Sequence, residues 1–127
     1  MNKKWNILYI TDVDSTFAVD TQLLDQYFEK SCIVPDTHKA LKLIYNTKYD
    51  AIIHDITNDP LDGMVFLKQI KEMKPDLPQI AFVLPNDEEK IGGLIDSGVH
   101  TFLLMPEQLE QAFEAIKGMN FQVEKKS

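Results

Sequence analysis

The sequence contains a single cysteine, Cys32, among its 127 residues. One thiol cannot form an internal disulfide, so no covalent cross-link within the chain stabilises the fold. A lone cysteine in a domain of this size is usually a small apolar residue of the interior, and we expect that role for Cys32. The low cysteine content is typical of a reducing compartment, and we predict a cytoplasmic location.

Long apolar runs and clusters of basic residues are also missing. No stretch approaches the roughly 20 apolar residues that a membrane-spanning helix needs. The opening, MNKKWNILYI, holds only a short apolar run before Thr11 and Asp12, which is not the pattern of a secretory signal. Lys and Arg number 13 against 20 Asp and Glu, giving a net charge of −7. This balance disfavours nucleic acids and anionic membranes as partners, because both are bound through clustered basic side chains.

The length and composition are those of one globular domain. Hydrophobic residues make up 44% of the chain and charged residues 26%, so a hydrophobic core is expected and disorder of the whole chain is excluded. We predict one domain over residues 1–120 and a polar C-terminal tail over residues 121–127. We expect a monomer or a weak dimer.

Short apolar runs alternate with helical patterns along the whole chain. The predicted strands are 6–11, 32–34, 49–56, 79–84 and 100–104, and the predicted helices are 15–28, a segment beginning after Asp36, 62–73, 86–98 and 106–118. Strict alternation predicts a parallel sheet with helices on both faces. The fold class we predict is α/β, a flavodoxin-like (βα)5 three-layer sandwich with strand order 2-1-3-4-5, whose sites lie at the carboxyl ends of the strands.

Acidic residues follow the first and third predicted strands. Asp12, with Asp14 nearby, ends one strand and Asp55 ends the other. In this fold the two strand ends are neighbours. Carboxylates at such a short distance repel one another unless a cation or a proton lies between them. Mg²⁺ takes such oxygen ligands, and an Asp beside it can attack a phosphoryl group. The alternative is that both residues only cap or solvate loops.

Three segments give the chain its resemblance to a known family. These are NILYITD, YDAIIHDITNDPLDG and SGVHTFLLMPE. Over about residues 6–118, the chain resembles the receiver domain of bacterial two-component response regulators. The first segment is similar to the family's first strand and its acidic end. The second is similar to its third strand, phosphoacceptor and loop, with Gly63 at the loop glycine.

The resemblance assigns roles to individual positions. Asp55 matches the phosphoacceptor, and Asp12 matches the second of the family's two adjacent acids. Thr11 stands where the first acid would be, and Asp14 is the nearest acid that could replace it. Thr57 matches the position whose backbone carbonyl binds the metal. The implied function is a signal-transduction module of a two-component phosphorelay, not an enzyme. Mg²⁺ would bind a weakened site, and a histidine kinase or phosphotransfer protein and a downstream protein would be its partners.

Other positions depart from the family pattern. The hydroxyl-bearing residue at the end of the fourth strand falls at Val83 or Leu84, and the Lys before the last Pro is Met105. Neither an aliphatic side chain nor a thioether can make the charge-assisted bond that an ammonium makes to a phosphoryl group. Phe102 matches the aromatic switch position without its partner hydroxyl, and its alternative role is ordinary core. The chain is therefore expected to be an atypical receiver, and the second hypothesis is a degenerate receiver that docks partners without phosphorylation.

Two further functions have weaker support in the sequence. The segment TDVDST resembles the opening of haloacid-dehalogenase-type phosphatases, with Asp12 as nucleophile and Asp14 as acid/base partner. The later Lys and acidic pair of that family find no match here. A flavin binder is disfavoured because the first loop lacks the glycines that cradle a phosphate. His54 precedes Asp55 and is expected to point to the opposite face of the sheet, away from it.

Overall fold

The computed structural model describes residues 5–12, 14–57, 60–92 and 99–119. The predicted tail, residues 121–127, lies outside these residues. The elements are β1 (Asn6–Ile10), α1 (Thr21–Leu24), β2 (Lys30–Val34), α2 (Thr37–Asn46), β3 (Ala51–Asp55), α3 (Pro60–Met73), β4 (Gln79–Val83), the 3-10 helix η1 (Pro85–Ile91), β5 (His100–Leu103), the 3-10 helix η2 (Pro106–Gln108) and α5 (Leu109–Lys117).

The five strands form one parallel sheet in the order β2-β1-β3-β4-β5, as predicted. The central strands β1, β3 and β4 are almost entirely buried, which fits their near-continuous apolar sequences. In the β1–β3 pair, Ile10 lies opposite His54. The residues that follow, Thr11 and Asp55, therefore reach the same edge of the sheet.

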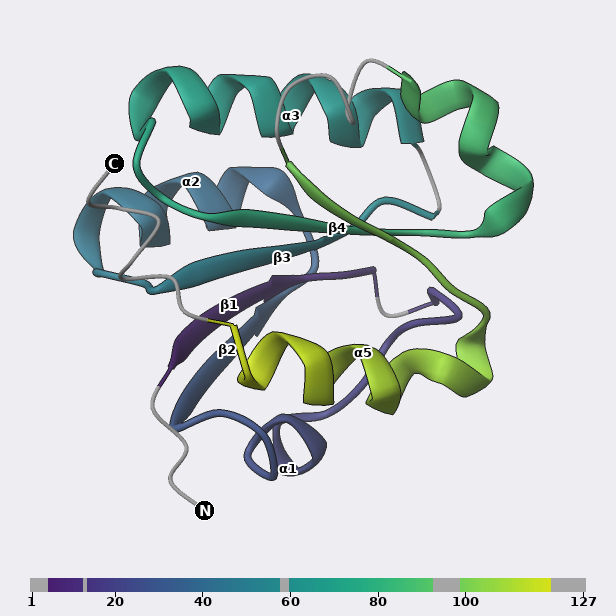
Figure 1. The fold of residues 1–127 in the computed structure, drawn as a ribbon. Helices are drawn as coiled ribbons and strands as arrows, with labels where there is room; N and C mark the ends of the chain where they lie inside the picture. Colours follow the sequence, from purple (N-terminus) through teal and green to yellow (C-terminus); the bar gives the residue numbers. More distant parts are fainter. Residues whose placement is uncertain (1–4, 13, 58–59, 93–98, 120–127) are drawn as a thin grey trace.

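Helices cover both faces of the sheet, so the fold has the predicted three layers (Figure 1). The helices α1 and α5 pack on one face, and α2 and α3 pack on the other. Aromatic rings fill the first layer: Phe113 of α5 lies 5.9 Å from both Tyr9 and Phe82, centroid to centroid. Cys32 is half-buried against the second layer, close to the interior role expected for it.

The predicted helix over residues 15–28 is wrong in extent, because only Thr21–Leu24 is helical. Asp20 caps this short helix, its carboxylate accepting from the Leu23 N–H. Ser15, the first residue of the predicted helix, accepts the Phe17 N–H instead. Side chains that bond to nearby backbone groups compete with helix formation, and here they hold residues 14–17 in turns.

The predicted fourth helix lies only partly in the described residues. Its first part is the 3-10 helix η1, which begins at Pro85 after the N-cap Leu84, with no side-chain cap. The predicted start at Asn86 is therefore wrong by one residue, and residues 93–98 of the prediction lie outside the described part of the chain. The helix predicted after Asp36 is confirmed, with the Asp36 carboxylate accepting from the Lys39 N–H at 2.8 Å.

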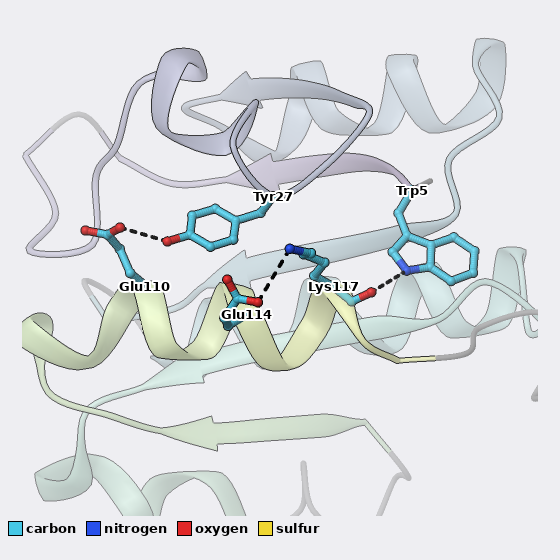
Figure 2. Close-up of polar contacts among 5 residues, drawn as sticks. All are labelled: Trp5, Tyr27, Glu110, Glu114 and Lys117. Atoms are coloured by element: carbon cyan, nitrogen blue, oxygen red, sulfur yellow. Dashed lines mark hydrogen bonds and ion pairs between the residues drawn. The ribbon is translucent and has the colours of Figure 1, made fainter. Parts of the chain in front are cut away.

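Polar contacts join α5 to the opening of the chain and to the segment after α1 (Figure 2). The Tyr27 hydroxyl donates to the Glu110 carboxylate at 2.8 Å. The Trp5 indole N–H donates to the Lys117 carbonyl at 3.2 Å, and the Lys117 ammonium lies 3.6 Å from Glu114. The hydrogen bonds at Glu110 and Lys117 lie near the two ends of α5, so they fix the orientation of a helix that apolar packing holds against the sheet.

Candidate functional site

The candidate site lies at the carboxyl edge of the sheet, around Asp55 at the end of β3. Each carboxylate oxygen of Asp55 accepts two hydrogen bonds. Oδ1 accepts from the Thr57 hydroxyl at 2.7 Å and from the Thr57 N–H at 3.1 Å. Oδ2 accepts from the Thr11 hydroxyl at 2.6 Å and from the Ser15 hydroxyl. A carboxylate offers about four lone-pair positions, so these donors occupy all of them.

The three hydroxyls of Thr11, Ser15 and Thr57, called the hydroxyl cluster below, come from three different places in the chain. Thr11 follows β1 and is buried, and its backbone N–H donates to the Val34 carbonyl at 3.0 Å. Ser15 lies in the turns after β1, and Thr57 lies two residues beyond β3. The cluster therefore forms only when β1 and β3 pair.

The Ser15 hydroxyl has a fixed orientation. Its oxygen accepts from the Phe17 N–H at 3.1 Å while its proton faces Asp55. The Phe17 carbonyl in turn accepts from the Tyr9 hydroxyl at 2.6 Å. Burial, and after it the negative charge of Asp55, raise the pKa of the Tyr9 hydroxyl, so Tyr9 stays a donor. A chain of hydrogen bonds thus links the core residue Tyr9 to the carboxylate.

Asp12, the second predicted site residue, shares a cavity with Asp55. The cavity has a volume of about 240 Å³, and four acidic residues are among those that line it, Asp12, Asp36, Asp55 and Asp62. Asp12 is exposed, and its Oδ1 accepts from the Asp14 N–H at 3.0 Å. The structure therefore brings Asp12 and Asp55 to one edge, as expected, while the direct contacts of Asp55 are with hydroxyls.

The donor set bears on Mg²⁺. Two carboxylates and the Thr57 carbonyl are hard oxygen ligands, which suit this ion in kind. Among the residues that the structure describes, no group of three His, Cys, Asp or Glu side chains is placed to hold a metal. Thr11 also removes the repulsion that an adjacent acid would create. The residues thus suit Mg²⁺ in kind, but they supply one carboxylate fewer than the family's pair of adjacent acids and Asp55 would. The carboxylate of Asp55 is also already satisfied by hydrogen bonds.

The sequence does not predict two of the contacts of Asp55. Ser15 falls at the start of a predicted helix and Thr57 is assigned only a backbone carbonyl, whereas both hydroxyls donate to Asp55. The available signal was the density of hydroxyl residues beside the acids in the two strand-end segments. Spacing could not have revealed it, because Ser15 reaches Asp55 through a turn where a helix was predicted.

Gly63 brings the start of α3 close to the end of β3. A Cβ atom at this position would lie 2.7 Å from the Ile56 Cβ. Only glycine avoids this collision, since contacts under 3.0 Å force the neighbouring atoms to move. Ile56 separates Asp55 from Thr57, so Gly63 also protects the geometry of the site.

His54 points away from Asp55, as predicted. Its ring is buried against Phe66 of α3, with centroids 5.8 Å apart, and its Nε2 lies 2.8 Å from Gln79 Oε1. Gln79 donates its amide N–H to the Leu67 carbonyl at 3.1 Å, so its Oε1 faces His54 and His54 Nε2 carries the proton. Burial lowers the pKa of His54 to about 4.

The ends of β4 and β5 carry the departures from the family pattern. Val83 is fully buried and Met105 is 45% exposed. The Phe102 ring is half-buried and packs edge-on against Phe82 at 5.9 Å, which is the alternative core role. No charged or hydroxyl side chain stands at these positions to bind a phosphoryl oxygen.

The parallel sheet of order 2-1-3-4-5 places this chain among the flavodoxin-like α/β domains, and acidic residues lie at the carboxyl ends of its strands. The chain belongs to the response regulator receiver domain family, whose model matches residues 7–117. This confirms the resemblance drawn from the three sequence segments.

Curated relatives and solved structures agree with this assignment. The chain is 26% identical over 119 residues to the probable C4-dicarboxylate response regulator DctR of Bacillus subtilis, covering 91% of this chain and 52% of that protein. It is 28% identical over 88 residues to the response regulator MprA of a Mycobacterium species, covering 68% and 38%. The chain therefore spans about half or less of these relatives.

Among solved structures, the N-terminal receiver domain of a response regulator from Bacteroides fragilis superposes with a TM-score of 0.70 at 18% identity, covering 91% of this chain and 98% of that one. At this identity the likeness shows the fold alone. Within the described residues, no helix has both the length and the apolar character needed to cross a bilayer.

Proposed function

We propose that this receiver domain accepts a phosphoryl group on Asp55 and passes the signal on through contacts with other proteins. The observation that carries the proposal is the placement of Asp55. It ends β3 at the carboxyl edge of the sheet and lines a cavity with Asp12. Within the family this is the position of the phosphoacceptor. The donor would be a histidine kinase or a phosphotransfer protein, and the output partner a downstream protein.

The transfer step needs few groups from this chain. One oxygen of Asp55 forms the new O–P bond while the P–N bond of a donor phosphohistidine breaks. The bonding pair stays on that nitrogen, and a proton on the other ring nitrogen makes the leaving group a neutral imidazole. Mg²⁺ bound to Asp12, Asp55 and the Thr57 carbonyl would neutralise charge on the incoming group. Thr57 orients the carboxylate through its bonds to Oδ1. The domain thus acts as a recipient of phosphate and not as an enzyme with turnover.

The output surface we propose includes the end of β5. Leu103 is 40% exposed and Met105 is 45% exposed, so two large apolar side chains face solvent there. Both positions are next to η2 and α5, in the region that relatives in this family use for contacts. Without a Lys at Met105 or a hydroxyl at Val83, phosphorylation makes few new contacts and is coupled weakly to this surface.

A second candidate function is a degenerate receiver that docks partners without phosphorylation. The observation that favours it is the saturation of Asp55 by four hydrogen bonds, which leaves the carboxylate stable with neither cation nor phosphate. In this case the domain presents one fixed surface to its partner.

Intact-mass measurement after incubation with acetyl phosphate and MgCl₂ tests the proposal. We expect a phosphoryl adduct in the wild type that is lost in Asp55→Asn and still formed, but more slowly, in Asp12→Asn, because Asp12 is only a ligand of the metal. The exposed carboxylate Asp76 provides a matched control, because Asp76→Asn should also retain the adduct. Absence of any adduct favours the docking module, and turnover of a phosphate ester abolished by Asp12→Asn would favour the phosphatase.

A further inference from the structure

We infer that the hydroxyls of Thr11 and Ser15 compete with a divalent cation for Asp55 and so set how readily the site is loaded. The inference deepens the proposed function, since it concerns the regulation of the same carboxylate. It rests on one observation of geometry. Both lone-pair positions of Oδ2 are taken by these two hydroxyls, so a cation that binds this oxygen has to displace one of them.

The hydroxyl of Ser15 is held toward Asp55 by its surroundings. The Phe17 N–H fixes the Ser15 oxygen at 3.1 Å, and Tyr9 fixes Phe17 from inside the core. The Ser15 and Thr57 hydroxyl oxygens lie 3.1 Å apart, and either of them can be the donor in that contact. The Ser15 proton therefore has two acceptors close by, Thr57 and the charged Asp55, and the hydrogen bond to the charged acceptor is the stronger one.

Thr11 acts in the same direction through charge. Thr11 lies directly beside Asp55, and its hydroxyl donates to the Asp55 carboxylate at 2.6 Å. A second carboxylate at this position would repel that of Asp55. A cation stabilises two adjacent carboxylates strongly because it removes their repulsion, and that contribution is missing when one of them is a threonine. The Asp55 carboxylate therefore has all of its hydrogen bonds when no cation is bound, and cation binding has to displace one of them.

The two hydroxyls thus make opposite contributions to two measurable quantities. They stabilise the cation-free fold, and they weaken the binding of the cation. A hydroxyl with a merely structural role would stabilise the fold without weakening cation binding. Removing one hydrogen bond to a charged group should change the affinity for the cation by about tenfold.

The test is a titration of the ¹⁵N-labelled full chain with MgCl₂, followed by the amide signals of Thr57 and of the residue at position 15. We expect weak binding in the wild type and a dissociation constant about tenfold lower in Ser15→Ala and in Thr11→Val. Thr16→Ala is the matched control: Thr16 is the exposed neighbour of Ser15, and this variant should bind as the wild type does.

Urea unfolding without Mg²⁺ completes the test, with lower stability expected in Ser15→Ala and Thr11→Val than in the wild type. If one variant fails to fold, as judged from the dispersion of its amide signals, the other carries the comparison. Equal or weaker Mg²⁺ binding in a folded variant overturns the inference.

The acetyl phosphate reaction, run on the same variants, separates this inference from the proposed function. Tighter Mg²⁺ binding with no adduct in any variant would support the competition and refute the phosphoacceptor role of Asp55. An adduct that forms while the Mg²⁺ affinities stay unchanged would refute the competition and support the phosphoacceptor role.

Discussion

At the scale of single residues, the site is defined by side chains that satisfy one carboxylate. Asp55 could have been stabilised by a cation shared with a neighbouring acid. In this chain three hydroxyls perform that task, and they are neutral. Because hydrogen bonds to a charged acceptor are roughly twice as strong as neutral ones, the cluster is a stable arrangement on its own.

Gly63 provides the sharpest prediction at this scale. Gly63→Ala should lower the free energy of unfolding by about 1–3 kcal/mol, because the new methyl group overlaps Ile56 at the end of β3. Urea denaturation measures the change. Amide signals of Thr57 should shift as well, since Ile56 lies between Asp55 and Thr57.

Gly92→Ala is the matched control for this substitution. A Cβ atom at Gly92 would meet nothing within 4 Å, and its backbone is helical with φ −53°. Alanine there should be neutral or should stabilise the domain by about 0.5–1 kcal/mol. Equal losses of stability in the two variants would contradict the packing role assigned to Gly63.

At the scale of secondary-structure elements, the sequence predicted the strands better than the helices. The central strands β1, β3 and β4 are apolar along nearly their whole length, because both of their faces are covered, and this pattern has few alternative explanations. The helix after Asp36 was also predictable, since a cap and an apolar face coincide there.

The helix predicted over residues 15–28 failed for a reason that lies outside its own residues. Apolar positions such as Phe17, Leu24 and Phe28 have helical spacing and are buried, so the pattern was real. Leu24 lies in the short helix α1, whereas Phe17 is buried in a turn, because Ser15 bonds to Asp55 and the Phe17 carbonyl accepts from the Tyr9 hydroxyl. Tertiary hydrogen bonds of this kind cannot be predicted from the spacing of apolar residues along the sequence.

The attachment of α5 gives the prediction at this scale. Tyr27→Phe removes the 2.8 Å hydrogen bond to Glu110 and keeps the ring, whose centroid lies 5.6 Å from that of Phe113. We expect a loss of about 1 kcal/mol in the free energy of unfolding and faster amide exchange near Glu110. The Glu110 hydrogen bond and nearby charge also raise the pKa of Tyr27 to about 12, and this value should be measurable by absorbance.

Tyr45→Phe is the control for the loss of a phenol hydroxyl. Tyr45 is 66% exposed on α2, so its substitution should change neither stability nor exchange in α5. If Tyr27→Phe behaves like Tyr45→Phe, the contact seen in Figure 2 contributes nothing to the docking of α5.

At the scale of the whole molecule, stability should depend on pH through one buried histidine. The folded state holds the pKa of His54 at about 4, below its ordinary value of 6.5, because the ring is buried. Between these two values the unfolded chain binds a proton that the folded chain does not. Stability should therefore fall as the pH drops from about 6.5 to about 4, by about 3 kcal/mol from this group.

Urea denaturation at several pH values measures this effect. Carboxylates titrate in part of the same range, so the informative quantity is the difference between the wild type and His54→Gln, which can keep a donor toward Gln79. The variant should lose less stability on acidification. His38→Gln, at an exposed position, should follow the wild type, and parallel curves for all three proteins would rule out His54 as the cause.

The sequence by itself determined the order of the sheet and the edge at which the site lies. Apolar strands alternating with helices leave few topologies, and the carboxyl ends of parallel strands meet on one side. The sequence therefore predicted that Asp12 and Asp55, which are 43 positions apart, lie at the same edge. The family resemblance followed from the same residues and is confirmed over residues 7–117.

Only the tertiary structure decided what Asp55 touches. Contacts between side chains depend on directions set by turns, and the turn after β1 aims Ser15 at the carboxylate while Asp12 stays exposed. The same holds for Gly63, whose lack of a side chain matters only because Ile56 occupies that space. Local patterns carry information about neighbours along the chain, whereas these contacts join segments that meet only when the sheet has formed.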